Sequence, residues 1–236
     1  TLLSNFVKEK ECSNVTVQLT PGAVYKVSEL KIPGLDNILF TSTEANENNR
    51  PQLIVTNKIS LASPIQSLSF EFVCLNGNGE ASYMTDWKNS SYAQSISFTG
   101  CAIQNIKRTL VRISDGSGVF MTDITIDNCV IYEVGTDGYG MINFGKNIDQ
   151  LEKVSITNST LINIGDQLMD VKGGIGDVIL ENCTFYNSMD AKKELPKVFR
   201  FDNAASTPPS PKSATMRNLI FSGPNKGKKM NSGNGA

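Results

Sequence analysis

The sequence predicts an all-β fold, a single-stranded right-handed parallel β-helix in which three-strand coils stack as a solenoid. Two observations lead to this fold: one line of sequence recurs along the chain, and apolar residues alternate within each copy. The line "DITIDNCVIYEVG" at 123–135 returns as "KVSITNSTLINIG" at 153–165 and as "DVILENCTFYNSM" at 177–189. A weaker copy, "SISFTGCAIQNIK", stands at 95–107.

Each copy has the spacing of short strands. Apolar residues stand two apart before the bend, as at Ile124 and Ile126, and a second pair follows later, as at Val111 and Ile113. Alternation with period 2 is typical of strands. The copies repeat after 28, 30 and 24 residues, which is the length of a coil of three strands, and such coils bury their apolar side by stacking. Leucine-rich repeats have a similar length, but their strict Leu framework is missing here.

An asparagine stands at the same place in three copies: Asn128, Asn158 and Asn182, with Gly100 in the weaker copy. A bend between two strands often needs a positive φ, which Asn and Gly tolerate best. Coils lie about 4.8 Å apart, so the amides of successive coils can bond to one another. We therefore expect a buried Asn ladder. The alternative is that these residues are ordinary turn formers.

Small residues follow this bend in each copy: Cys101, Cys129, Ser159 and Cys183. Interior side chains stacked beside the ladder explain the pattern better than a disulfide framework or a zinc site, because no CxxC pair occurs. Stacked side chains also point in parallel, which is poor disulfide geometry. We expect all five cysteines of the chain to be free thiols.

The whole chain, 1–236, is expected to form one domain. Residues 1–10 predict a short amphipathic helix that caps the open N-terminal end of the solenoid. The remaining parts are irregular first coils at 14–61, regular coils at 67–222 with loops at 76–94, 187–197 and 203–215, and a tail at 223–236.

Composition excludes several classes of function. The net charge is −1 and 19% of residues are charged, so nothing points to a nucleic-acid partner. No apolar run reaches the length of a transmembrane segment. The chain has no histidine, which excludes His-based triads and His metal sites. No export signal is present in this chain, although a removed one is compatible with it.

With these coils in place, the chain resembles the pectate-lyase-like superfamily of parallel β-helices. The opening "VTVQLTPGAVYKVSELKIPGLDNILFTST" looks like the first coil of such proteins, and the "xIxIxNCxIYxxG" lines carry an Asn-ladder signature. More narrowly, it is similar to bacterial cell-surface β-helix domains of unassigned function associated with glycan uptake. The resemblance implies a polysaccharide or oligosaccharide partner, with other cell-surface glycan-uptake proteins beside it. It also implies an extracellular, cell-surface or periplasmic location.

In the resembling enzymes the substrate lies over one sheet, which by strand order contains 110–114, 141–145, 168–172 and 198–202 here. With the apolar pairs inward, a strip of polar residues faces outward on this sheet. It consists of Arg112, Ser114, Asn143, Gly145, Asp170, Lys172, Arg200 and Asp202. One interpretation is a ladder of ion pairs on a solvated sheet, each worth less than about 1 kcal/mol. The other is a saccharide-binding face, with Arg and Lys on carboxylated sugars and with Asp and Asn on hydroxyls.

The same alignment of coils predicts the position of the single tryptophan. An offset of 28 residues would place Met84 beside Arg112 and Trp87 beside Asp115. Trp87 would then overhang the strip as a stacking platform, with Tyr83 nearby. The alternative is that Trp87 is a local packing plug.

The strip gives no catalytic assignment. A lyase of this superfamily would need a base, for which Arg112, Lys172 or Arg200 would serve, and calcium held by Asp170 and Asp202. The acidic triplet and the RxPxxR-like element of pectate lyases are absent, and the related hydrolases use a His. We therefore expect a non-catalytic carbohydrate-binding protein without metal or cofactor. The alternatives are a polysaccharide lyase acting on acidic glycans, which alone would bring calcium, and a structural surface domain without ligand.

Overall fold

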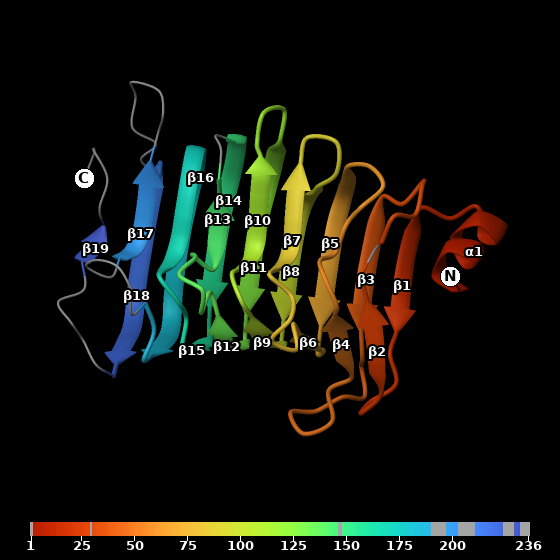
Figure 1. Cartoon of the computed structure of the whole chain (residues 1–236), viewed down its shortest axis with the longest axis horizontal. Helices are drawn as coiled ribbons and strands as arrows, with labels where there is room; N and C mark the ends of the chain where they lie inside the picture. The colour runs from red at the N-terminus through yellow and green to blue at the C-terminus, as the bar shows by residue number, and fades with distance from the viewer. Residues whose placement is uncertain are drawn as a thin grey trace.

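The computed structural model describes residues 2–28, 30–145, 148–189, 197–202, 211–223 and 229–231. Its strands stack side by side along the long axis of the molecule (Figure 1), and the pairings between successive coils are parallel. The predicted parallel β-solenoid is confirmed. Helix α1 (Leu2–Lys10) lies at the N-terminal end of the stack next to β1 (Figure 1), where a helix is predicted for residues 1–10.

The strands form three columns, which we call the first, second and third faces. The first face contains β1 (Asn14–Gln18), β3 (Asn37–Thr41), β5 (Ile65–Glu71), β8 (Ala93–Thr99), β11 (Phe120–Asp127) and β14 (Ile148–Thr157). The second contains β2 (Val24–Val27), β4 (Gln52–Val55), β6 (Cys74–Asn76), β9 (Ala102–Ile106), β12 (Val130–Val134) and β15 (Thr160–Ile162). The third contains β7 (Tyr83–Lys88), β10 (Thr109–Asp115), β13 (Ile142–Phe144), β17 (Lys197–Asp202) and β19 (Lys229–Asn231).

Two long strands connect these faces. β16 (Gln167–Tyr186) pairs with β13 and β17 on the third face, then with β14 on the first and with β15 on the second. β18 (Ser213–Ser222) pairs along β16 on the first and second faces. One coil therefore passes from the third face to the second without leaving β16.

The core lies inside the stack, where the alternating apolar residues point. Ile124, Ile126, Val111 and Ile113 are fully buried, as the period-2 pattern predicts. Phenylalanines of successive coils stack within this core, and the Phe70 ring lies 5.5 Å from Phe98 between ring centroids. Each coil thus covers the apolar side of the next.

The asparagines at the bend are exposed, so the predicted burial of Asn158 and Asn182 is wrong. Their backbones do take the expected positive φ, 50° and 54°, as does Asn128 at 52°. The Asn182 side-chain amide donates to Asn158 Oδ1 at 3.0 Å, and Asn218 donates to Asn182 Oδ1 at 2.9 Å. The physical reason is that the bend turns these side chains outward, so the amide contacts run along the outer edge of the solenoid.

The residues after the bend fill the interior instead. Cys101, Cys129, Ser159 and Cys183 are all buried, as predicted. The Cys101 thiol donates to the Phe70 carbonyl oxygen at 3.4 Å, a contact with the preceding coil. Burial raises the pKa of the Cys101 thiol well above its usual value. All five cysteines of the chain are free.

A thiol-reactive dye is expected to distinguish the native from the unfolded protein. Cys12 is partly exposed, whereas the other four cysteines are buried, so only the Cys12 thiolate reaches solvent readily. We expect one rapidly titrated thiol in native protein and five in denaturant without reductant. Fewer than five in freshly prepared, denatured protein would contradict the free-thiol prediction, and a Cys12→Ser variant should lose only the rapid phase.

The predicted loop at 76–94 is wrong in its centre, because β7 occupies 83–88 and pairs with β10. Parts of the other predicted interruptions are strands: β17 begins at Lys197, β18 begins at Ser213, and β19 lies in the predicted tail. The segments 190–196, 203–210, 224–228 and 232–236 lie outside the described residues. In the described part of the chain, no helix is long and apolar enough to cross a membrane.

Candidate functional site

Five polar side chains form one row across the third face. Arg112 on β10 lies in register with Asp86 on β7 and with Asn143 on β13. Asp170 on β16 lies in register with Asn143 and with Arg200 on β17. We call Asp86, Arg112, Asn143, Asp170 and Arg200 the polar column. Period-2 alternation turns its side chains away from the core, because the residues on either side of each member point inward. Asn143 is nevertheless buried between its neighbours.

The carboxylates of the polar column each lie between two donors. Asp86 contacts Lys58 Nζ at 3.0 Å and Arg112 Nη1 at 3.3 Å. Asp170 Oδ2 accepts from Asn143 Nδ2 at 3.2 Å and lies 3.7 Å from Arg200 Nη1. The ion pairs that the sequence allows are therefore present. Only 13% of the Asp86 side chain and 15% of the Asp170 side chain are exposed, against 41% for Arg200, so the cations are the more accessible groups.

A second row follows two residues further along the strands. Ser114 Oγ donates to the Trp87 carbonyl oxygen at 3.2 Å, and Lys172 Nζ donates to the Gly145 carbonyl oxygen at 3.4 Å. Lys172 lies in register with Asp202, whose side chain lies outside the described residues. Asp170 and Asp202 are thus two positions apart on neighbouring strands.

Trp87 does not overhang this surface. It is fully buried and lies in register with Ile113, not with Asp115. The residue in register with Arg112 is Asp86, where the sequence alignment predicted Met84. The prediction of a Trp87 stacking platform is wrong. Between its registered positions on the second and third faces, the coil of β6 and β7 has two residues more than the coil of β9 and β10. The offset between these coils is therefore 28 residues on the second face and 26 on the third.

Tyr83, not Trp87, is the aromatic ring beside the polar column. The Arg112 guanidinium lies 4.5 Å from the centroid of the Tyr83 ring. Arg108 Nη1 donates to Tyr83 Oη at 2.9 Å, and the Arg108 guanidinium lies 4.8 Å from the centroid of the Tyr139 ring. The hydrogen bond to Tyr83 raises the pKa of Arg108. We call Tyr83, Arg108, Arg112 and Tyr139 the arginine–tyrosine stack; sequence analysis missed it, because Arg108 and Tyr139 lie in turns where no alternation signals them.

The two arginines of this stack have more N–H donors than the hydrogen bonds described above use. A guanidinium carries five N–H groups, and Asp86 takes one of those on Arg112. Among the described residues, the Nε atoms of Arg108 and Arg112 are covered and make no hydrogen bond. These covered Nε atoms are out of reach of a ligand, so carboxylate or hydroxyl oxygens of a ligand would have to meet the Nη N–H groups of the two arginines.

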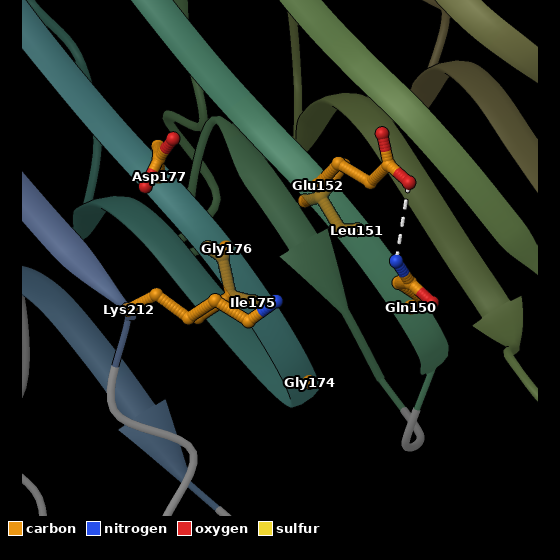
Figure 2. Close-up of a pocket in the computed structure, with 8 residues that line it drawn as sticks. All are labelled: Gln150, Leu151, Glu152, Gly174, Ile175, Gly176, Asp177 and Lys212. Carbon is orange, nitrogen blue, oxygen red and sulfur yellow. Dashed lines mark hydrogen bonds between the residues drawn. The ribbon is translucent and has the colours of Figure 1, made fainter.

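A hollow of about 430 Å³ lies where the third face passes into the first (Figure 2). Its lining residues are Gln150, Leu151, Glu152, Gly174, Ile175, Gly176, Asp177 and Lys212. Gln150 Nε2 donates to Glu152 Oε1 at 3.2 Å, and Ser213 Oγ donates to Asp177 Oδ1 at 2.8 Å. The hollow begins two residues after Lys172 on β16, so it adjoins the polar surface of the third face.

Acidic groups do not gather as metal ligands in the described residues, because no three Asp, Glu or Cys side chains come close enough to hold an ion. Calcium usually takes several carboxylate and carbonyl oxygens at once. In the polar column the two carboxylates already contact cations. The arrangement offers binding groups for oxygen-rich ligands more readily than a cation site.

A family model described as Domain of unknown function (DUF4957) matches residues 39–164, more than half of the chain. The chain belongs to the DUF4957 family. The DUF4957 match runs from β3 to the turn after β15 and includes Asp86, Arg112 and Asn143 of the polar column. Neither the curated proteins nor the solved structures contain a match to this chain.

Proposed function

We propose that the third face binds an oligosaccharide or polysaccharide that carries carboxylate groups, and that it does so without catalysis. The observation that carries the proposal is the polar column itself, with two arginines in register and Tyr83 against one of them. Arginine binds carboxylates through paired N–H groups, and a tyrosine ring offers a flat surface for the apolar side of a sugar.

The geometry of a solenoid suits an extended ligand. Successive coils are about 4.8 Å apart, so the five members of the polar column span about 19 Å along the axis. A linear saccharide laid along this row would meet one member of the polar column at each coil, with the two arginines three coils apart. Since such polymers are met outside the cytoplasm, we propose an extracellular or cell-surface setting, with glycan-uptake proteins as neighbours.

Binding is favoured over lyase chemistry by the state of the carboxylates. A lyase needs acids that hold calcium next to the uronate, whereas Asp86 and Asp170 lie between donors of the protein itself. An arginine base for proton abstraction would also have to lose a proton that its high pKa strongly retains. These contacts support the binding of an acidic sugar, and not its cleavage, as the proposed function.

Replacing Arg200 with alanine is expected to weaken binding of polygalacturonate about tenfold or more, because a hydrogen bond to a charged group is worth about 1.5–3 kcal/mol. The Tm should change little, since an exposed ion pair adds about 0–1 kcal/mol. Calorimetric titration of parent and variant at low and high salt measures both quantities, and binding should weaken as salt increases.

Arg217 supplies the matched control. It is another exposed arginine, on the first face, and it pairs with Glu181 at 2.6 Å. Arg217→Ala should bind like the parent. Equal losses in both variants would indicate general charge attraction, and absence of binding to any carboxylated glycan in an array would refute the proposed function. Release of unsaturated uronide products would favour the lyase instead.

A further inference from the structure

We infer a second saccharide subsite, for a neutral sugar, on the second face around Tyr132 and Tyr186. Tyr132 on β12 lies in register with Ile162 on β15, and Ile162 lies in register with Tyr186 on β16. The two tyrosines point outward and are 37% and 53% exposed. They are two strand spacings apart, about 10 Å, which is comparable with the length of a disaccharide.

The two rows of strand residues that contain these tyrosines carry no charged side chain in the described residues. From β4 to β18 the outward residues of the second face form two rows, and neither row contains a charged side chain in the described strands. These residues are Gln52, Cys74, Ala102, Val130, Thr160, Thr184 and Ile220 in one row, and Ile54, Asn76, Gln104, Tyr132, Ile162, Tyr186 and Ser222 in the other. Cys74 and Asn76, away from the tyrosines, are buried. A face of this kind suits the apolar side of an uncharged sugar ring.

Hydrogen-bonding groups stand directly beside the tyrosines. A hollow of about 270 Å³ follows them at the corner between the second and third faces, and its lining includes Glu133, Asn163, Asp166 and Asn187. In the sequence, Glu133 follows Tyr132, Asn163 follows Ile162, and Asn187 follows Tyr186. The Asn187 amide donates to Asn163 Oδ1 at 2.8 Å. Aromatic rings flanked by carboxylates and amides are the combination that a neutral sugar needs, since its hydroxyls both donate and accept.

Glu133 has a backbone conformation that suits asparagine better than glutamate. It has φ 54°, and the residues in register with it on neighbouring coils are asparagines with similar positive values: Asn105 at 58° and Asn163 at 53°. Asn tolerates this region far better than Glu. Strained residues of this kind cluster at binding sites. A carboxylate therefore interrupts a column of asparagines at the coil where Tyr132 stands.

This subsite is independent of the polar column, because it lies on another face and uses uncharged rings where the polar column uses arginines. Its test uses cellohexaose, xylohexaose and laminarihexaose as neutral probes. We expect the parent protein to bind at least one of them, and Glu133→Asn to weaken that binding about tenfold or more. The same variant should raise the Tm by about 2–4 °C, because it relieves the strained backbone.

Further variants separate the tyrosines from the rest of the face. Tyr186→Ala is expected to weaken binding of the same hexaose about fivefold or more. Val24→Ser, at an exposed site near the N-terminal end of the second face, should leave it unchanged. A Glu133→Asn variant that gains stability but binds as the parent does would overturn the subsite, as would a parent that binds none of the probes. Concentration-dependent dimerisation that Tyr186→Ala abolishes, measured by sedimentation, would instead identify the face as a contact between two copies of the chain.

Discussion

Replacing Trp87 with alanine is expected to lower the free energy of unfolding by about 3–5 kcal/mol. Trp87 is fully buried on β7, and its position in register with Ile113 points it into the core. Truncation to alanine would leave a large cavity between two coils, and the surrounding side chains can relax into it only in part. Urea unfolding followed by far-ultraviolet circular dichroism measures this loss without depending on tryptophan emission.

Trp87→Phe is the matched control. The Trp87 indole N–H is buried and has no hydrogen-bond acceptor among the described residues. Phenylalanine removes this unsatisfied group while it fills most of the same space. We expect Trp87→Phe to retain most of the stability that Trp87→Ala loses. If Trp87→Ala instead unfolded like the parent and lost glycan binding, Trp87 would be a surface platform and its burial would be wrong.

The fold was predictable because the solenoid repeats one local rule. Each coil stacks on the next in register, so apolar pairs such as Ile124 and Ile126 had to recur with the same spacing. Alternation also placed Arg112, Asp170 and Arg200 outward on one face, which the register confirms. These predictions needed only the direction of side chains along a strand, which a period of 2 determines.

The errors arose at bends and turns, where no such period exists. The recurrence of Asn158 and Asn182 predicted a backbone with positive φ, but it contained no information on which way their side chains would point. Trp87 was misplaced because its coil has two extra residues between the registered positions of the second and third faces. The arginine–tyrosine stack depends on a contact between Arg108 and Tyr139. Both residues lie in turns, so the strand period carries no information on this contact.

One feature of the second face could have been found from the sequence. When the repeated lines are aligned, Glu133 falls where Asn163 and Asn187 stand in later copies. A residue that breaks a column of asparagines is a signal of strain once the column is known to need positive φ. What the sequence could not provide was the hollow beside Glu133, because this depends on how the turns of successive coils pack.

Replacing Phe70 with alanine is expected to cost about 3–5 kcal/mol, and more than the same change at Phe40. Phe40, Phe70 and Phe98 form one column, with ring centroids 5.5 Å apart at each step. Phe70→Ala removes both ring contacts, whereas Phe40→Ala leaves the stack of Phe70 on Phe98. Each stacked aromatic pair adds about 0.5–1.5 kcal/mol beyond area burial, which sets the expected difference between the two variants.

The position of Phe70 also predicts how the variant should unfold. In a solenoid each coil contacts only its neighbours, so a weakened interface can separate the transitions on its two sides. Trp87 lies on the third strand of the coil that contains Phe70, and its emission therefore reports on that coil, while circular dichroism reports on all of them. We expect Phe70→Ala to lower the urea midpoint seen by Trp87 emission more than the midpoint seen by circular dichroism. Coincident midpoints, shifted no further than those of Phe40→Ala, would show that the Phe70 stack contributes no more than an ordinary core contact.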